Sequence, residues 1–421
     1  MSIFVLFFTL FLLLALSVPV GLCIGGATVV TLLLFSDLNL QIIAQYAVTG
    51  VDSFPLMAIP FFILAGTIMS TGGLARRLVD VAASLIGWIT GGLGAVVAVS
   101  SMFFGALSGS SLATVSAIGS IMVPQMERKG YDLGYSAVFT ACAGTVGAVI
   151  PPSIPLVIYG VCTGTSVGDL FIAGILPGIL IGIGLIIGNY YTCKKSGYKG
   201  EEKAPPRTVL HTIWEAKWAL LTPVIILGGI YSGIFTPTEA AIIAVVYSTI
   251  ISVFVYKEMT LRDLYETFER TIVINGSTTF LLGISTAFAA YMSMAQIPAK
   301  LTTLLVGITD NKFLFLIIIN VALLLIGCVF DNIPATIILS PMLLPTMLCF
   351  SVDPVHFGII LTVNLLIGLV TPPYGCSLFV ASAVCGVSME TMLKRMAVPF
   401  LTLIISLLII TFVPQLSLCL L

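Results

Sequence analysis

Two small polar clusters lie inside apolar stretches of this chain, where their oxygen atoms could hold a cation. The first cluster is rich in hydroxyl groups, and its candidate ligands are Ser108, Ser110, Ser111 and Thr114. The second cluster is built on Asp331 and Asn332. Carboxylate, carbonyl and hydroxyl oxygens are the ligands that hard cations prefer. Both clusters are therefore candidate sites for an ion such as sodium.

A pair of adjacent prolines lies downstream of each cluster. Pro151-Pro152 and Pro372-Pro373 each interrupt an apolar run. A proline lacks the amide hydrogen and clashes with the preceding turn, so neither run can form one continuous helix. Broken backbone at membrane depth exposes carbonyl groups that can bind a cation, and helix amino termini that favour an anion. The backbone from Gly147 to Pro151 extends the first candidate site, and Thr371 with the backbone near Gly375 extends the second.

Asp331 is the sharpest single candidate among these residues. An ionised carboxylate at membrane depth costs several kcal/mol unless it is paired, and no basic residue is near it in the sequence. A bound metal ion would supply the positive charge that pairs with the Asp331 carboxylate. The alternative is that Asp331 only caps the helix that follows it. For the serines of the first cluster, close packing of membrane helices is an equally good explanation.

The composition defines the setting of these clusters. Of the 421 residues, 59% are hydrophobic and 8% are charged, and the mean hydropathy is +1.18. Soluble domains carry about a quarter charged residues, so the chain is expected to be an all-α protein that crosses a membrane many times. The net charge of −1 gives no reason to expect a nucleic-acid partner, and the nine cysteines show no metal-ligand spacing.

The order of apolar and polar segments predicts two similar halves. Residues 3–34 are expected to form one retained span that bends at Pro19, and Thr236-Pro237-Thr238-Glu239 is expected to start a helix with a capping box. Two hairpins, at 91–126 and 313–350, are expected to enter the membrane and return on the same side. For the first hairpin, two full spans joined by the tip remain an alternative. The predicted segments are a first repeat in 1–192 (surface arm 74–90, hairpin 91–126, broken helix 133–164), a linker in 193–217, and an extra span with a second repeat in 218–421 (arm 256–270, hairpin 313–350, broken helix 355–386).

The similarity of the halves can be tested by shifting the chain against itself by 221 residues. Seven of 29 positions are then identical between 124–152 and 345–373, where roughly two would be expected by chance. The span expected at 218–235 has no counterpart in the first half, so the second repeat should be inverted in the membrane. With the amino terminus in the cytoplasm, all 17 basic residues except Lys300 and Lys312 fall on the cytoplasmic side, as the positive-inside rule requires.

Several motifs together resemble the large membrane subunit of tripartite ATP-independent periplasmic (TRAP) transporters. They are Asp52-Ser-Phe-Pro-Leu-Met-Ala-Ile-Pro-Phe-Phe-Ile-Leu-Ala-Gly66, Phe104-Gly-Ala-Leu-Ser-Gly-Ser-Ser-Leu-Ala-Thr114, Gly147-Ala-Val-Ile-Pro-Pro-Ser153, Ala173-Gly-Ile-Leu-Pro-Gly178 and Asp331-Asn-Ile-Pro-Ala335. The resemblance covers nearly the whole chain. It implies a sodium-coupled importer of organic anions in a bacterial inner membrane, with no cofactor beyond the coupling ion.

The resemblance also implies partners, a mechanism and roles for particular residues. A periplasmic binding protein would deliver the substrate, a separate small membrane subunit of about four helices would accompany the chain, and the hairpins and broken helices would slide as one body, as in an elevator. The expected sodium ligands are Ser108, Ser110, Ser111, Gly147, Pro151, Asp331, Asn332, Thr371 and Gly375. The residues expected at the substrate are Ser110, Ser111, Thr114, Pro152, Ser153, Asn332 and Pro373.

Three other functions compete with this interpretation. The first is a sodium and anion symporter that needs no binding protein. The second is a membrane-embedded enzyme with a serine nucleophile, which would need a base. Both His211 and His356 are expected in loops away from the serines, so this function is disfavoured. The third is a channel. The pair of inverted hairpins favours a transporter with alternating access over a channel.

Overall fold

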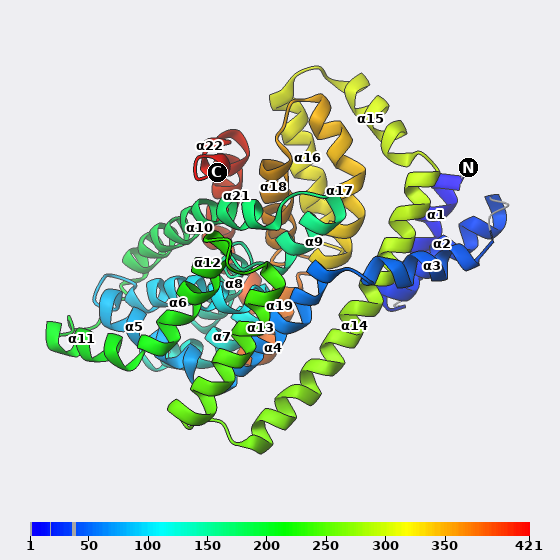
Figure 1. Ribbon diagram of the computed structural model, residues 1–421. Coiled ribbons are helices and arrows are strands. Elements are labelled where there is room, and N and C mark those ends of the chain that lie inside the picture. Colours follow the sequence, from blue (N-terminus) through cyan, green and yellow to red (C-terminus); the bar gives the residue numbers. More distant parts are fainter. Residues whose placement is uncertain (1, 17, 36–38) are drawn as a thin grey trace.

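The computed structural model describes residues 2–16, 18–35 and 39–421, and the regular structure of these residues is entirely helical (Figure 1). The elements of the first half are α1 (Ser2–Ala15), α2 (Val20–Phe35), α3 (Gln41–Val51), η1 (Phe54–Met57), α4 (Ala58–Thr71), α5 (Leu74–Ile86), α6 (Gly92–Ser108), α7 (Ser111–Arg128), α8 (Leu133–Val146), α9 (Ile154–Thr163) and α10 (Val167–Ser196). The linker contains α11 (Pro206–Glu215), so it is not wholly irregular.

The second half repeats the same kinds of element. They are α12 (Lys217–Tyr231), α13 (Pro237–Ile250), the π-helical turn η2 (Ile251–Val255), α14 (Leu261–Met294), α15 (Ile297–Ile308), α16 (Lys312–Gly327), α17 (Asn332–Cys349), α18 (Pro354–Gly368), α19 (Cys376–Cys385), α20 (Met389–Leu393), α21 (Ala397–Phe412) and α22 (Gln415–Leu418).

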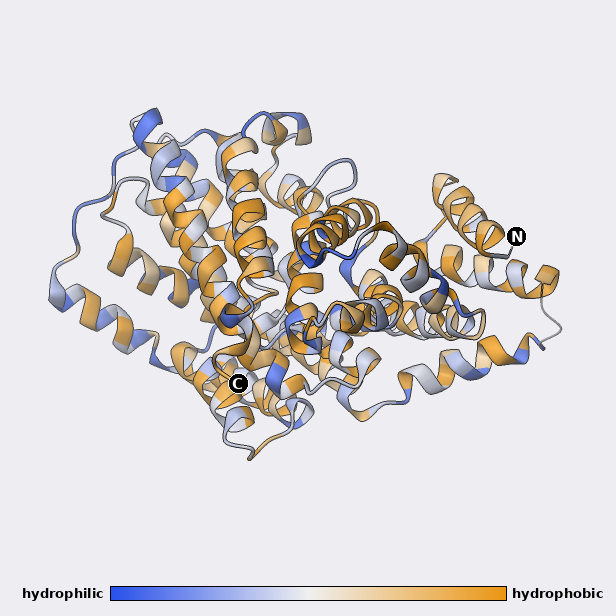
Figure 2. Ribbon diagram, turned by 90° about the horizontal axis from the view of Figure 1, so that it is seen from above, coloured by the Kyte–Doolittle hydropathy of each residue, from blue (hydrophilic) through white to orange (hydrophobic). Residues whose placement is uncertain are grey.

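Several of these helices can cross a membrane by length and composition. Phe54–Thr71, Val167–Ser196, Pro237–Val255, Leu261–Met294 and Asn332–Cys349 meet this condition, and α11 with α12, bent by 59°, would add a sixth. Figure 2 shows hydrophobic residues along most helices and hydrophilic residues mainly at helix ends and in loops. The expectation of an all-helical protein with many apolar helices is confirmed.

The helix bounds follow the 221-residue shift found in the sequence. Shifting α7 by 221 residues gives the bounds of α17, and shifting α8 gives those of α18 to within one residue. The same shift takes α5 to within two residues of α15, and α9 to within one residue of α19. Both predicted hairpins (α6 with α7, α16 with α17) and both broken helices (α8 with α9, α18 with α19) are present as helix pairs.

The predicted surface arm at 256–270 is wrong. The structure has a turn at 256–260, and then α14 continues without interruption from Leu261 to Met294. The charges of its first turns suggested a separate surface helix, but no proline interrupts the segment, and its two internal glycines, Gly276 and Gly283, are tolerated. By the 221-residue shift, the counterpart of α5 is α15.

The prediction of a single first span is also wrong. The segment forms two helices, α1 and α2, which fold back and pack against each other on either side of Pro19. A Cβ atom added at Gly26 would lie 3.0 Å from Leu13, and one added at Gly21 would lie 3.2 Å from Phe280 of α14. These close contacts hold α2 between α1 and α14, which a simple bend at the proline would not allow.

Helix α13 begins as the sequence predicts. The Thr236 hydroxyl accepts a hydrogen bond from the Glu239 amide at 3.3 Å, and the Glu239 carboxylate accepts from the Thr236 amide at 2.8 Å. This reciprocal pair is a capping box, and Pro237 occupies the first turn, where no amide hydrogen is needed.

Helices α4 and α14 form a wall and run in opposite directions. At one end, the Asn275 amide nitrogen donates to the Pro60 carbonyl at 3.4 Å. At the other, Arg77, just beyond α4, lies 2.6 Å from Glu258, just before α14. Later residues of α4 therefore meet earlier residues of α14. The wall is completed by α13, which packs on α4, and by α3, which packs on α14.

Candidate functional site

The first hairpin tip is a tight turn that rests on the first helix break. Helix α6 ends at Ser108, Gly109 takes a left-handed conformation with φ of 61°, and Ser110 caps α7 by accepting from the Ala113 amide. A side chain at Gly109 would collide with the Pro152 carbonyl, because a Cβ there would lie 2.6 Å from that oxygen. The Gly109 carbonyl accepts a hydrogen bond from the Ile154 amide at 3.2 Å.

Hydroxyl groups of the first cluster are bound mainly to one another and to nearby backbone. The Thr114 hydroxyl donates to the Ser110 carbonyl at 2.8 Å and lies 3.4 Å from the Ser108 hydroxyl. Within the break, the Ser153 hydroxyl donates to the Ala148 carbonyl at 2.5 Å and accepts from the Leu156 amide at 3.4 Å. The sequence therefore places a compact group of oxygens at the tip.

Glycines allow each hairpin to approach its broken helix closely. A Cβ at Gly105 would lie 2.1 Å from the Gly147 Cα, and one at Gly368 would lie 2.5 Å from the backbone of Gly327. These pairs occupy nearly equivalent places in the two halves, since Gly147 and Gly368 are 221 residues apart. Backbone-to-backbone contact of this kind is possible only without side chains.

The second tip and break have a similar architecture with different side chains. The Asp331 carboxylate accepts from the Asn332 amide at 2.7 Å and caps α17, so Asp331 does cap its helix. In the break at 369–375, the Thr371 hydroxyl donates to the Ile367 carbonyl at 2.8 Å, and Gly375 has a φ of 48°. The Ser377 amide donates across the break to the Leu369 carbonyl at 2.9 Å.

The two halves meet through crossed contacts. Helix α7 of the first hairpin packs on α19 of the second broken helix, and α17 of the second hairpin packs on α9 of the first. The buried hydroxyls of Ser111 and Ser377 lie 3.2 Å apart. Each hairpin therefore contacts both breaks, which brings the predicted clusters into one region.

A cavity of about 550 Å³ at the protein surface is distinct from this region, and a second cavity of about 470 Å³ lies between the two tips. The second is lined by Ser108, Ser110, Ser111, Asp331 and Asn332 of the predicted site. Its opposite wall consists of α4 and α14. The structure thus brings both tips to one cavity, as expected. We call it the central cavity.

The other predicted residues do not line the central cavity. Those of the first break and its neighbourhood are buried behind the tip: Thr114, Gly147, Pro151, Pro152 and Ser153. Those of the second break are also absent from the lining: Thr371, Pro373 and Gly375. The two breaks also differ in accessibility, because Pro151 and Pro152 are buried whereas Pro372, Pro373 and Tyr374 are exposed.

The residues that form the wall of the cavity were not predicted from the sequence. Ile63, Gly66, Thr67 and Ser70 of α4 line it, together with Ile274 and Thr278 of α14. These positions recur at intervals of three and four residues, so each set lies on one helix face. This spacing could have identified a face, but only the fold shows that the face meets the tips.

The position predicted for His356 is wrong. Because Pro354 occupies the first turn of α18 and Asp353 caps it, His356 lies inside the helix and is buried. Its ring nitrogens lie 3.2 Å from the Ser417 hydroxyl and 3.3 Å from the Thr411 carbonyl. His211 is exposed in α11, not in a loop. Neither histidine lines the central cavity.

Apolar helices, two broken helices and a shared cavity define a multi-span helical membrane protein. Residues 7–416 match the family model described as the tripartite ATP-independent periplasmic transporter, DctM component. The chain belongs to this family of TRAP transporter large permease proteins. The resemblance inferred from the motifs is confirmed.

Three known proteins show how far the similarity extends. The isethionate TRAP transporter permease protein DctMQ of Oleidesulfovibrio alaskensis is 44% identical over 406 residues, which are 96% of this chain and 64% of that protein. The C4-dicarboxylate TRAP transporter large permease protein DctM of Pseudomonas aeruginosa is 41% identical, over 94% of this chain and 93% of that one. The sialic acid TRAP transporter large permease protein SiaM of Vibrio cholerae is 36% identical, over 96% and 94%.

The fold is also similar to a solved structure. The YdaH transporter of Alcanivorax borkumensis matches with a TM-score of 0.64 and 15% identity, over 91% of both chains. At this identity the likeness concerns the fold alone.

Proposed function

We propose that this chain is the large membrane subunit of a sodium-coupled secondary transporter that imports an organic anion. The observation that carries the proposal is the central cavity, where the two tips meet opposite α4 and α14. Asp331 is the only ionisable residue among those that line it. Because no lysine, arginine or histidine is there to balance an anion, cations that enter with the substrate would supply the missing charge.

The expected ligands are assigned as follows. Sodium ions bind at the two tip-and-break regions, through hydroxyl and carbonyl oxygens of the first and through the Asp331 carboxylate of the second. The substrate binds between the tips, where Ser110, Ser111 and Asn332 face the cavity. Thr114, Pro152, Ser153 and Pro373 lie outside the lining, so we assign them to supporting the tips in this conformation.

We also propose that the two halves are inverted repeats. Helices α4 and α14 correspond under the 221-residue shift, and their contacts run in opposite order. Between them, the broken helix α8–α9, α10, α12 and α13 each cross the membrane once, so α14 starts on the side where α4 ends. In an elevator, the hairpins and broken helices would slide as one body along the wall of α3, α4, α13 and α14.

The partners follow from the family and stay proposals for this chain. We expect a small membrane subunit on a separate chain and a periplasmic binding protein that delivers the substrate. The relatives are named for isethionate, C4-dicarboxylate and sialic acid, so a carboxylate, sulfonate or sugar acid is the substrate class we propose. The location is the bacterial inner membrane.

The orientation of the amino terminus needs revision. A cytoplasmic amino terminus was expected from a single first span, but α1 and α2 fold back on each other, so the pair begins and ends on the same face. With Arg76 and Arg77 kept on the cytoplasmic side, only α4 crosses before them. We therefore place the start of α1 on the periplasmic face.

Uptake into proteoliposomes tests the proposed function. The chain would be reconstituted with the small subunit and binding protein encoded beside it, after the binding protein's ligand is identified by thermal shift with isethionate, succinate and N-acetylneuraminate. We expect uptake that requires an inward sodium gradient and the loaded binding protein. Uptake driven by a proton gradient alone would refute sodium coupling, and equal uptake without the binding protein would support the symporter alternative.

The two remaining alternatives have separate tests. A serine-reactive probe that labelled Ser110 would favour an enzyme, although the relatives are permeases and Ser110 has no histidine beside it in the cavity lining. Single-channel currents from the reconstituted protein would favour a channel.

A further inference from the structure

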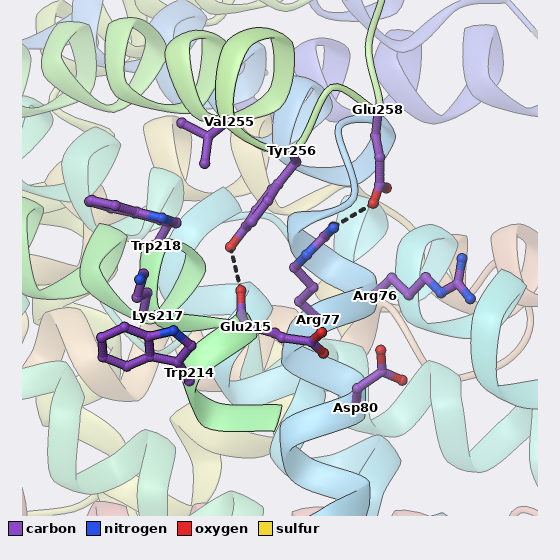
Figure 3. Close-up of a pocket in the computed structure, with 10 residues that line it drawn as sticks. All are labelled: Arg76, Arg77, Asp80, Trp214, Glu215, Lys217, Trp218, Val255, Tyr256 and Glu258. Atoms are coloured by element: carbon purple, nitrogen blue, oxygen red, sulfur yellow. Dashed lines mark hydrogen bonds and ion pairs between the residues drawn. The ribbon is translucent and has the colours of Figure 1, made fainter. Parts of the chain in front are cut away.

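The 550 Å³ cavity at the surface has a lining unlike that of the central cavity. It is formed by Arg76, Arg77, Asp80, Trp214, Glu215, Lys217, Trp218, Val255, Tyr256 and Glu258. These residues come from α5, from the junction of α11 and α12, and from the turn between η2 and α14 (Figure 3). Three basic and three acidic side chains share this cavity with three aromatic rings. We call it the junction cavity.

The cations of the junction cavity keep unused hydrogen-bond donors. Nη1 of Arg77 contacts Glu258 at 2.6 Å and donates to the Gly73 carbonyl at 3.0 Å, but within the described residues no hydrogen bond uses its Nε or Nη2. The Lys217 ammonium lies 3.7 Å from the centre of the Trp214 ring and forms no ion pair with a carboxylate of the described chain. Such groups can still bind phosphate oxygens.

Two carboxylates in the same cavity lack a strong cationic partner. Asp80 and Glu215 form no ion pair with a lysine or arginine in the part of the chain that the structure describes, and Glu215 has only the His211 ring at 3.7 Å. Desolvation raises the pKa of Asp80, Arg76 and Arg77 oppose this effect, and the Glu215 charge adds to it. Figure 3 shows the Glu215 side chain extending toward Asp80. Both carboxylates can accept hydrogen bonds from an ammonium group.

The aromatic rings are already occupied by cations of the protein. The Arg77 guanidinium lies 3.6 Å from the centre of the Tyr256 ring, and Lys217 covers Trp214 and also lies 5.4 Å from Trp218. A quaternary ammonium needs free aromatic faces, whereas a primary ammonium can donate hydrogen bonds to carboxylates. The lining therefore favours a phosphate joined to a primary amine.

An exposed apolar face leads away from the junction cavity. On α12 it comprises Trp218, Leu221 and Val224, and on α13 and η2 it comprises Val246, Ile250 and Phe254, all at least 36% exposed. The two helices pack on each other, and the Tyr247 hydroxyl donates to the Trp218 carbonyl at 2.9 Å. Exposed tryptophans beside basic residues mark the membrane interface, so acyl chains would lie along this face while the headgroup entered the cavity.

We propose that the junction cavity binds the headgroup of an ethanolamine phospholipid. The phosphate contacts Arg77 and Lys217, the primary amine contacts Asp80 and Glu215, and the acyl chains follow α12 and α13. Because the cavity joins α5 to α12 and to the turn before α14, the bound lipid would also hold the surface arm against the wall. This inference needs only that the protein lies in a membrane and does not depend on the transported substrate.

Tryptophan fluorescence gives a direct test, because the chain has three tryptophans and two line the cavity. Full-length protein carrying Trp88→Phe would be placed in phosphatidylcholine nanodiscs that contain a small fraction of phosphatidylethanolamine brominated near the ester groups. We expect quenching to saturate at a low fraction and to exceed that by brominated phosphatidylcholine at the same fraction. Equal quenching by the two lipids, or stronger quenching by brominated phosphatidylglycerol, would overturn the proposal.

Substitutions in the cavity add a second readout. We expect Lys217→Gln and Asp80→Asn each to weaken the binding of phosphatidylethanolamine about tenfold, as the loss of one charge-assisted hydrogen bond should. Lys217→Arg keeps the positive charge and should bind phosphatidylethanolamine as well as the unsubstituted protein does. The matched control is Lys194→Gln, whose lysine lies 5.8 Å from the Tyr190 ring and outside the cavity. Unchanged binding in both variants would refute the site.

Discussion

The Ser111 hydroxyl, at the first hairpin tip, lies 3.2 Å from the Ser377 hydroxyl, at the start of the helix that follows the second break. The two residues are 266 positions apart, and both are buried. This contact joins the two halves beside the central cavity. A conformational change at the first tip is therefore expected to alter the second break.

Removing this contact should cost stability in a coupled manner. We expect Ser111→Ala and Ser377→Ala each to lower the free energy of unfolding by about 1 kcal/mol, and the double variant to lose less than the sum. Ser120→Ala, which removes a bond only within its own helix, is the control. Melting temperatures of the four proteins would measure the coupling, and strictly additive losses would show that the hydroxyls do not interact.

Asp331→Asn should abolish sodium-dependent uptake while the protein still inserts and remains folded. The amide keeps the shape of the side chain but not its charge, so we expect uptake to fall about a hundredfold, as for the loss of one partner of a buried charge pair. The measurement is initial uptake at saturating sodium. Asp310→Asn, at an exposed position before α16, should leave uptake unchanged. Normal uptake by Asp331→Asn would leave Asp331 with capping as its role.

Gly105→Ala should damage the first hairpin. Its new methyl group would meet the Gly147 backbone at 2.1 Å, and neither backbone can move without shifting a helix. We expect a loss of about 1–3 kcal/mol of stability, as for other overpacked sites, together with a loss of uptake. Gly228→Ala in α12 provides the comparison, because no atom lies within 4 Å of a Cβ there. A normal melting temperature for Gly105→Ala would contradict the close packing.

The amino terminus should be accessible from the periplasm. An epitope placed ahead of α1 should bind antibody in intact spheroplasts, because in the topology proposed above the α1–α2 pair begins and ends on the same face and α4 crosses once before Arg77. The same epitope inserted after Glu202, in the loop before α11, should bind only after permeabilisation. Antibody binding to the first epitope only after permeabilisation would restore a cytoplasmic amino terminus.

The cap of α13 should depend on the Glu239 carboxylate. This carboxylate accepts hydrogen bonds from the Thr236 amide and hydroxyl, both at 2.8 Å. An uncharged side chain accepts weaker hydrogen bonds, so amide exchange at the start of α13 should be faster in Glu239→Gln than in the unsubstituted protein at neutral pH. Equal exchange rates in the two proteins would contradict this prediction.

The features that could be predicted from sequence are those fixed by local backbone chemistry. Pro151-Pro152 and Pro372-Pro373 forbid a continuous helix wherever they occur, and Thr236 with Glu239 contains the whole capping box within four residues. The hairpins could be predicted in the same way, because each has an apolar arm on either side of a short polar tip. These elements are present in the structure at the expected places.

The features that were missed depend on contacts between distant segments. Whether the chain bends or reverses at Pro19 is decided by the packing of Gly21 and Gly25 on Phe280 and Ile284 of α14, which no local pattern contains. The continuity of α14 was hidden by the charges of its first turns. Likewise, Thr67 and Thr278 become wall residues only because α4 and α14 stand opposite the tips.

The 34 residues of α14 make a rod about 51 Å long, whereas the hydrocarbon layer is about 30 Å thick. Its charged first turns, which include Arg262 and Glu266, must therefore protrude from the bilayer or the rod must lean strongly. A single continuous helix, α14, thus extends from the central cavity to the aqueous phase. A spin label attached at Glu266 would therefore report on ligand binding in the central cavity without changing any residue that lines it.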